Sequence, residues 1–307
     1  MSLLGQQYSS ACAENPAWWA SLNAVLAIAQ RRRAEIMQSS EAENIAWEYA
    51  ANALNSCLDV LMRSTQLLSV QAILSVAWFF MGTPNPQPSF MLIGCAVRLA
   101  HSIGIHSNNY DTASNVIDVY MKKRVFWIAA CLDREVCLRT GRPPCHDLEA
   151  SFVDAPAGSP DETEIVTTAA GLQVNLFKAQ SQLATIQSSI HHELLSSKSS
   201  PSGIAGSMSS FTDRLREWCN KFAPSLLEKC MQRHEHLGLT RLYLSYYNTV
   251  IITNRANSFN YWVPLNKPAR SKLTPDIEVS IESCLTASRS IIELSQSVPG
   301  NRKSFYW

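Results

Sequence analysis

RLAHSIGIHS (98–107) and KKRVFWIAACLDREVCLRTGRPP (122–144) are the two stretches that decide the fold of this 307-residue chain. Around the first, apolar residues from Phe90 to Ile103 cover nearly the whole circumference of a helix, as burial on most sides requires. Around the second, apolar residues recur at helical spacing from Val116 to Thr140. The closing G-R-P-P places a glycine at the helix C-cap and prolines where no helix can continue. We therefore predict a buried helix, a loop and a long helix that stops abruptly.

Asp133 lies on a mostly apolar face of the second predicted helix. A buried carboxylate needs a charged or hydrogen-bonding partner, because isolating it costs several kcal/mol. Arg98, in the apolar helix just upstream, is likewise short of solvent. We predict that Arg98 and Asp133 form an ion pair that fixes the register of the two helices, with a catalytic role for Asp133 as the alternative.

The order of these motifs resembles a known family. An R-L-A-x-S-h-G-h-H helix (h for apolar) spans 98–106, a basic and aromatic helix with Trp127 and Asp133-Arg134 follows, and G-R-P-P closes the series. This order is similar to that of the middle homology region of fungal binuclear zinc-cluster transcription factors, the fungal-specific transcription factor domain. NPAWWASLNAVLAIA (15–29) and residues 238–258, which contain LYLSYYNTVIITNRANS, also resemble parts of that region. The resemblance covers about residues 15 to 300 and implies an all-helical fold.

Helical periodicity in the rest of the chain supports the same fold class independently. It occurs in residues 18–28, 45–62, 70–81, 172–195, 211–222, 237–253 and 277–298. No stretch keeps the alternation of a strand for long. We predict an all-α fold, with one large domain of packed antiparallel helices over residues 1–307 that could divide into two subdomains. The best internal breaks are two loops, 154–164, rich in Pro, Gly and acid, and 196–210, rich in Ser and Gly.

The charge of the chain is nearly balanced, with 26 Lys and Arg against 25 Asp and Glu. It lacks the clustered positive charge typical of nucleic-acid-binding domains, so we expect no direct nucleic-acid binding. The run Arg31-Arg32-Arg33, after an apolar helical stretch, favours a solvated last turn over a phosphate-binding patch. The most apolar stretch, 70–81, is short of the roughly 20 residues that a bilayer span needs, so we expect no membrane insertion.

Nine cysteines, mostly on apolar helix faces, indicate buried thiols in a reducing compartment, the nucleus or the cytosol. The DNA-binding module of the family needs six cysteines in two C-x2-C-x6-C halves, and no C-x2-C occurs in this chain. The zinc cluster is therefore absent from it. Cys131, Cys137 and Cys145 have the wrong spacing for a metal site, and no phosphate-cradling or dinucleotide-binding glycine loop is present, so we expect neither a metal nor a cofactor.

Aromatic residues are numerous enough to line a cavity between helices, although core packing explains most of them. The candidates for a ligand pocket are Trp78, Phe79, Phe80, Phe126, Trp127, Tyr243, Tyr246 and Tyr247. For acid or base catalysis the candidates are His101, Asp133 and Tyr246, each of which also has a structural explanation. His101 in particular is typical of a hydrogen-bonded core histidine.

Two functions of different class remain. The chain is either the regulatory region of a fungal transcription factor, or a cofactor-independent enzyme on the same scaffold, such as a cyclase or isomerase of secondary metabolism. As a regulator it would respond in the nucleus to a small apolar or aromatic metabolite, or to a regulatory protein partner, and a homodimer is compatible with the sequence. As an enzyme it would act in the cytosol. An enclosed pocket with a titratable group pointing inward would favour an enzyme or a sensor over a partner-binding scaffold.

Overall fold

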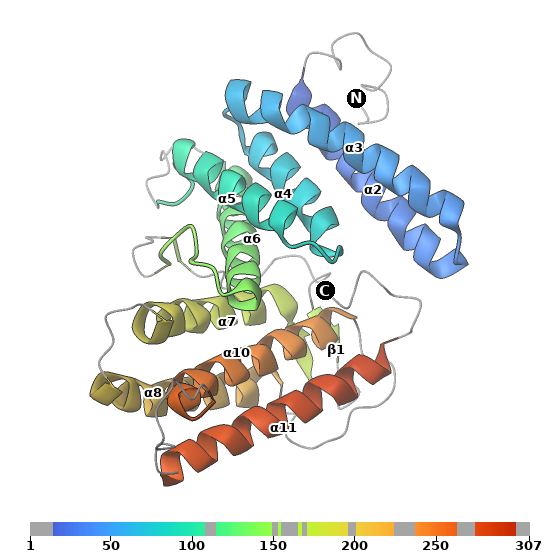
Figure 1. Cartoon of the computed structure of the whole chain (residues 1–307). Coiled ribbons are helices and arrows are strands. Elements are labelled where there is room, and N and C mark those ends of the chain that lie inside the picture. The colour runs from blue at the N-terminus through green and yellow to red at the C-terminus, as the bar shows by residue number, and fades with distance from the viewer. Residues whose placement is uncertain are drawn as a thin grey trace.

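The fold is all-α apart from one short pair of strands, as the sequence predicts (Figure 1). The computed structural model describes residues 15–107, 115–148, 153–154, 165–167, 171–195, 201–223, 237–262 and 274–298. Its helices are α2 (Pro16–Met37), α3 (Ser40–Arg63), α4 (Leu67–Met81), α5 (Gln87–Ser102), α6 (Val116–Thr140), α7 (Leu176–Ile190) with a π-helical turn η3 (His191–Leu195), α8 (Pro201–Phe222), α10 (Leu237–Trp262) and α11 (Pro275–Ser297). Strands β1 (Ile165–Thr167) and β2 (Gln173–Asn175) pair antiparallel, with Val166 opposite Val174.

Side-chain caps fix where several helices begin. The Asn15 carboxamide oxygen accepts hydrogen bonds from the backbone N–H groups of Ala17 and Trp18, and the proline that follows Asn15 takes the first helical position. Ser39 and Asn115 cap α3 and α6 in the same way. These polar residues supply acceptors for backbone donors that have no partner inside the helix.

The first hydrophobic core is formed by α2 to α6, the blue to green helices of Figure 1. Buried alanines at helical spacing line the two packed helices α2 and α3: Ala17, Ala20, Ala24 and Ala27 on one, and Ala42, Ala46, Ala50 and Ala53 on the other. Because alanine side chains are short, the two helices of this hairpin pack closely. The rings of Phe79 and Phe80 on α4 then meet edge to face at 5.2 to 6.0 Å with Trp47 of α3.

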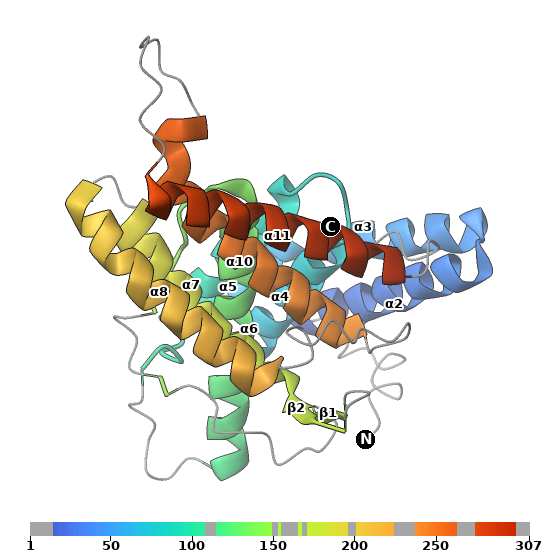
Figure 2. The same cartoon turned by 90° about the horizontal axis from the view of Figure 1, so that it is seen from below.

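The second hydrophobic core is formed by α7, α8 and α10, with α11 packed against α10. Figure 2 shows α10 between α8 and α11, and in Figure 1 these three helices lie at the other end of the molecule from α2 and α3. Tyr243 and Phe211 are fully buried in this core, and the Trp218 indole N–H donates to the Ala179 carbonyl at 2.9 Å. The described residues thus form two separately packed cores.

Helix α6 stands between the two cores (Figure 1) and packs against α5 and α4 on one side and α7 and α10 on the other. Nearly every residue from Val125 to Leu138 is buried, around the full circumference of the helix. Asp133, Arg134 and Glu135, three consecutive charged residues, are part of that buried stretch. Such charges are expensive to bury, so their partners decide how the cores are joined.

Two segments differ from the sequence-based expectation. Helix α8 begins at Pro201, inside the segment 196–210 for which a loop was predicted. The physical reason is a buried stripe at helical spacing that extends into this segment: Met208, Phe211, Leu215, Trp218 and Phe222. The other predicted loop, 154–164, lies outside the described residues apart from its first one. Helix α2 likewise continues past Arg31–Arg33 to Met37, and Arg31 is buried rather than solvated.

No helix among the residues that the structure describes is both long and apolar enough to span a bilayer.

Gly141 ends α6 in the left-handed conformation, at φ 69°, and its N–H and that of Arg142 both donate to the Cys137 carbonyl. A Cβ at this position would meet nothing within 4 Å, so a substitution costs only backbone strain. We expect Gly141→Ala to lower the free energy of unfolding by about 1 kcal/mol. Gly141→Asn should cost about half as much, because asparagine tolerates this conformation better. Urea unfolding followed by circular dichroism measures both variants. If the free energy of unfolding of Gly141→Ala equalled that of the unaltered chain, the assigned cap would be contradicted.

Candidate site between the two cores

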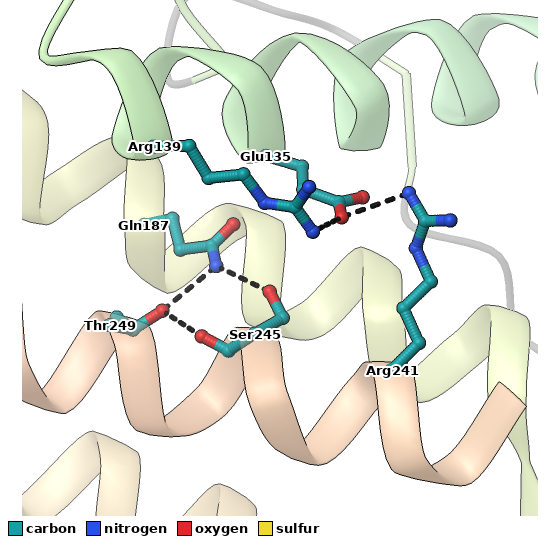
Figure 3. Close-up of polar contacts among 6 residues, drawn as sticks. All are labelled: Glu135, Arg139, Gln187, Arg241, Ser245 and Thr249. Atoms are coloured by element: carbon teal, nitrogen blue, oxygen red, sulfur yellow. Dashed lines mark hydrogen bonds and ion pairs between the residues drawn. The ribbon is translucent and has the colours of Figure 1, made fainter. Parts of the chain in front are cut away.

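Glu135 joins the two cores through an ion pair that involves two arginines (Figure 3). Its Oε1 accepts from Arg139, one turn further along α6, and from Arg241 of α10 at 2.9 Å. The Glu135 side chain is 5% exposed, whereas those of Arg139 and Arg241 are 24% and 25% exposed. Burial alone would raise the pKa of Glu135, but Arg241 and then Arg139 hold it below its ordinary value. Glu135 is therefore an ionised carboxylate at neutral pH.

A neutral hydrogen-bond network lies beside this ion pair (Figure 3). The Gln187 side chain of α7 donates to the hydroxyl groups of Thr249 at 2.9 Å and Ser245 at 3.2 Å, both on α10. The Thr249 hydroxyl in turn donates to the Ser245 carbonyl at 2.8 Å. Together with Glu135, this network places carboxylate, guanidinium, amide and hydroxyl groups within one region.

Two cavities adjoin Arg241. One of about 330 Å³ contains Glu135, Arg139, Gln187, Ser245 and Asn248 in its wall. The other, of about 300 Å³, is lined by Arg31, Arg32, Glu35, Trp78 and Phe79. Arg241 belongs to both walls, and its guanidinium carbon lies 4.3 Å from the ring centre of Trp78. The site thus combines a polar side and an aromatic side around one arginine.

Asp133 has partners other than the Arg98 predicted from the sequence. Its Oδ2 accepts from the backbone N–H of Cys145 at 3.0 Å and lies 3.8 Å from Arg134, and both side chains are 2% exposed. Arg98 is instead exposed and lines a separate apolar cavity of about 580 Å³. The predicted Arg98–Asp133 pair is therefore corrected: Arg98 is on the solvent-facing side of α5, and the residue next to Asp133 supplies the charge.

Burial raises the pKa of Asp133, although Arg134 and the hydrogen bond from Cys145 act in the opposite direction. The Arg134 guanidinium also donates to the His146 carbonyl. Asp133 and Arg134 thus hold the segment after α6 against the helix, which is a structural role.

His101 is half-buried and hydrogen-bonded, and it belongs to a group of three histidines. Its Nε2 lies 2.9 Å from Nδ1 of His146, and its ring centre is 4.9 Å from that of His106. Phe126 meets His146 edge to face at 5.4 Å. Within the described ranges, no group of three or more His, Cys, Asp or Glu side chains has the geometry of a metal site.

The pKa of His146 is lowered to about 4 by burial, and His101 and Arg134 act in the same direction. Because the ordinary value of about 6.5 applies to the unfolded chain, the unfolded state binds more protons between pH 4 and 6.5, and stability falls as the pH falls. We expect the free energy of unfolding to drop by about 1 kcal/mol from pH 7 to pH 5, after allowance for partial exposure.

His146→Asn should remove most of this loss, and His192→Asn, at an exposed position, should leave it intact. Urea unfolding at the two pH values measures both variants. An equal pH dependence in His146→Asn would assign the effect to other groups.

The predicted pocket residues divide between the cavity and the cores. Trp78 and Phe79 line the 300 Å³ cavity; Trp78 is 41% exposed, whereas Phe79 also belongs to the first core. The others lie in the cores: Phe80, Phe126 and Trp127 in the first, and Tyr243, Tyr246 and Tyr247 in the second. Core packing accounts for these six.

The catalytic candidates do not meet in one site. Tyr246 stacks on Trp218 at 5.4 Å in the second core, whereas His101 and Asp133 are on α5 and α6. Desolvation raises the pKa of Tyr246 above its ordinary value.

The residues that sequence reasoning missed are Glu135, Arg139 and Arg241. Only Glu135 and Arg139 carried a signal, as an oppositely charged i,i+4 pair within an apolar helix.

The fold and this site define a helical domain of two cores with charged cavities at their boundary. The chain matches the model of the fungal specific transcription factor domain over residues 7–220. It is 59% identical, over its whole length, to the Fusaridione A cluster transcription factor of Fusarium heterosporum, of which it covers 59%. It is 35% identical over its whole length to the ABC-transporter-regulating transcription factor of Aspergillus fumigatus, of which it covers 36%. No solved structure matches it.

The chain belongs to the fungal specific transcription factor domain family, as its motifs predicted. It spans about three fifths of the length of the Fusarium relative and about a third of that of the Aspergillus relative. These relatives are transcription factors, which supports a role in transcription regulation and does not favour the enzyme alternative.

Proposed function

We propose that this chain is the effector-sensing region of a nuclear regulator of transcription. A small molecule binds at the boundary between the two cores and changes how they are held together. The observation that carries the proposal is the Glu135–Arg241 ion pair, which links α6 to α10 and has a cavity on each side. An effector can shift a conformational equilibrium only through contacts that differ between the two states, and a pair at the boundary between two cores supplies such contacts.

The relatives support the regulatory class and suggest its targets. One is named for the fusaridione A cluster, so the genes under control here are proposed to be those of a secondary-metabolite cluster. A product or intermediate of the pathway would then bind the regulator to an extent set by its concentration, and so change transcription of the cluster.

A reporter assay tests this function. The intact chain is fused to a heterologous DNA-binding domain in a fungal reporter strain, and extracts from cultures with and without the neighbouring biosynthetic genes are added. Transcription should change several-fold with the metabolite-containing extract only, and the same extract should raise the unfolding temperature of the purified chain. Constant transcription under all extracts would overturn the proposal.

A further inference from the structure

We infer that the effector is a small organic anion with an apolar body, and that Glu135 occupies the position of its acidic group when the site is empty. This inference rests on the proposed function and names its ligand class. It begins from the two cavities that share Arg241.

The walls of these cavities hold more positive than negative charge. Four arginines, Arg31, Arg32, Arg139 and Arg241, face two carboxylates, Glu35 and Glu135. The whole chain has a net charge of only +1, so this is a local concentration of positive charge. In a partly buried site such an excess favours an anion more strongly than it would in water.

The hydrogen bonding of Glu135 leaves room for that anion. Both guanidinium groups donate to the same oxygen, Oε1, and Oε2 accepts no hydrogen bond from the described residues although it is buried. Nε of Arg241 is likewise buried and donates to none of them. An arginine binds a carboxylate best through two parallel N–H groups. Glu135 meets only one N–H group of Arg241, so an incoming acid that engages two forms the stronger contact.

The apolar body of the ligand is indicated by the aromatic cavity. Trp78 is 41% exposed there, and Ile28, Phe79 and Leu237 are in the same wall. Arg241 stacks over Trp78, so an acid held by this arginine has its attached carbon skeleton next to the indole. On the other side, Asn248 can hydrogen-bond to a carbonyl or hydroxyl group of the ligand. Each volume, of about 300 Å³, lies at the lower end of the range for small-molecule sites.

Binding of such an acid has a structural consequence. The ligand takes Arg241 from Glu135, which keeps Arg139 as its partner on the same helix. The direct ion pair between α6 and α10 is then replaced by a contact through the ligand. Effector binding is thereby coupled to the packing of one core against the other.

Matched acids and esters test the ligand class on the unaltered chain. The probes are 2-naphthoate, indole-3-acetate and octanoate, each compared with its methyl ester by isothermal titration calorimetry. At least one acid should bind at least tenfold more tightly than its ester. Its affinity should fall as salt is raised from 50 to 500 mM, because the Debye length shortens from about 14 Å to about 4 Å over that range. Equal binding of acid and ester, or no binding of any acid, would overturn the inference.

Three variants assign the binding to this site. Arg241→Gln should weaken the binding of the acid at least tenfold. Glu135→Gln should strengthen it about fivefold, because the competing charge is removed while an acceptor oxygen remains. Arg216→Gln, at a side chain that is 64% exposed on α8, is the matched control and should change nothing. Unaltered binding in both Arg241→Gln and Glu135→Gln would place the acid elsewhere and overturn the inference.

The two proposals fail in different ways. If the reporter responds to an extract but its active compound is neutral and binds Arg241→Gln normally, the effector-sensing function stands and the ligand class is wrong. If acids bind as expected and transcription never changes, the site is real and the sensing function is wrong.

Discussion

Asp133→Ala should lower the free energy of unfolding by about 4 kcal/mol, the largest effect expected of any charge substitution in the chain. The variant leaves the Arg134 guanidinium, which is 2% exposed, without its carboxylate. It also removes the acceptor for the backbone N–H of Cys145 and for the thiol of Cys137. Each buried donor left without an acceptor adds its own desolvation penalty.

Chemical unfolding in urea, followed by tryptophan fluorescence, measures this loss. Asp213→Ala is the control, because that carboxylate pairs with Arg216 on the surface of α8 and should contribute less than about 0.5 kcal/mol. Asp133→Asn keeps an acceptor oxygen and should fall between the two. If Asp133→Ala and Asp213→Ala were equally stable, the buried contacts of Asp133 would contribute nothing.

Glu135→Ala should cost about 3 kcal/mol and separate the unfolding of the two cores. Its removal leaves Arg139 and Arg241 facing each other across the boundary without a carboxylate between them. The penalty is smaller than for Asp133 because both guanidinium groups are partly exposed and can be solvated. Since Glu135 is the charged link between α6 and α10, we expect the second core to unfold in a step of its own.

Two buried indoles make the separation measurable. Trp127 belongs to the first core and Trp218 to the second. Because the chain has eight tryptophans, the signal of each core is the fluorescence that Trp127→Phe or Trp218→Phe removes, obtained by subtraction. In Glu135→Ala the two difference signals should give different unfolding midpoints. Adding Arg241→Met should recover part of the stability by removing one unbalanced charge. Coincident midpoints in Glu135→Ala would mean that apolar packing alone couples the cores.

Much of the fold was predictable because its signals are local. The bounds of α6 follow from the sequence, since periodicity runs up to Gly141 and the prolines forbid continuation. The start of α8 was missed because serine and glycine are weak helix formers, and here burial of one helix face outweighs their preference. Strands β1 and β2 are three residues each, too short to show an alternating pattern.

The candidate site was predictable only in part, because its central contact joins residues 106 positions apart. The burial of Asp133 could be predicted from its apolar neighbours. Its arginine partner could not, because the sequence does not show that Arg98 is on the side of α5 that faces solvent. The sequence places Trp78 and Phe80 in equally apolar surroundings. Only the packing of α3 and α4 decides that Phe80 enters the core while Trp78 borders a cavity.

The buried cysteines make it possible to measure partial opening of each core. All seven described cysteines carry free thiols; Cys57 and Cys131 are buried in the first core and Cys219 in the second. Burial raises the pKa of the Cys57 thiol to about 11, so alkylation in the closed state is slow. Timed alkylation followed by peptide mass spectrometry would therefore reveal which half of the molecule loosens first when an effector binds, in the unaltered chain and without an attached dye.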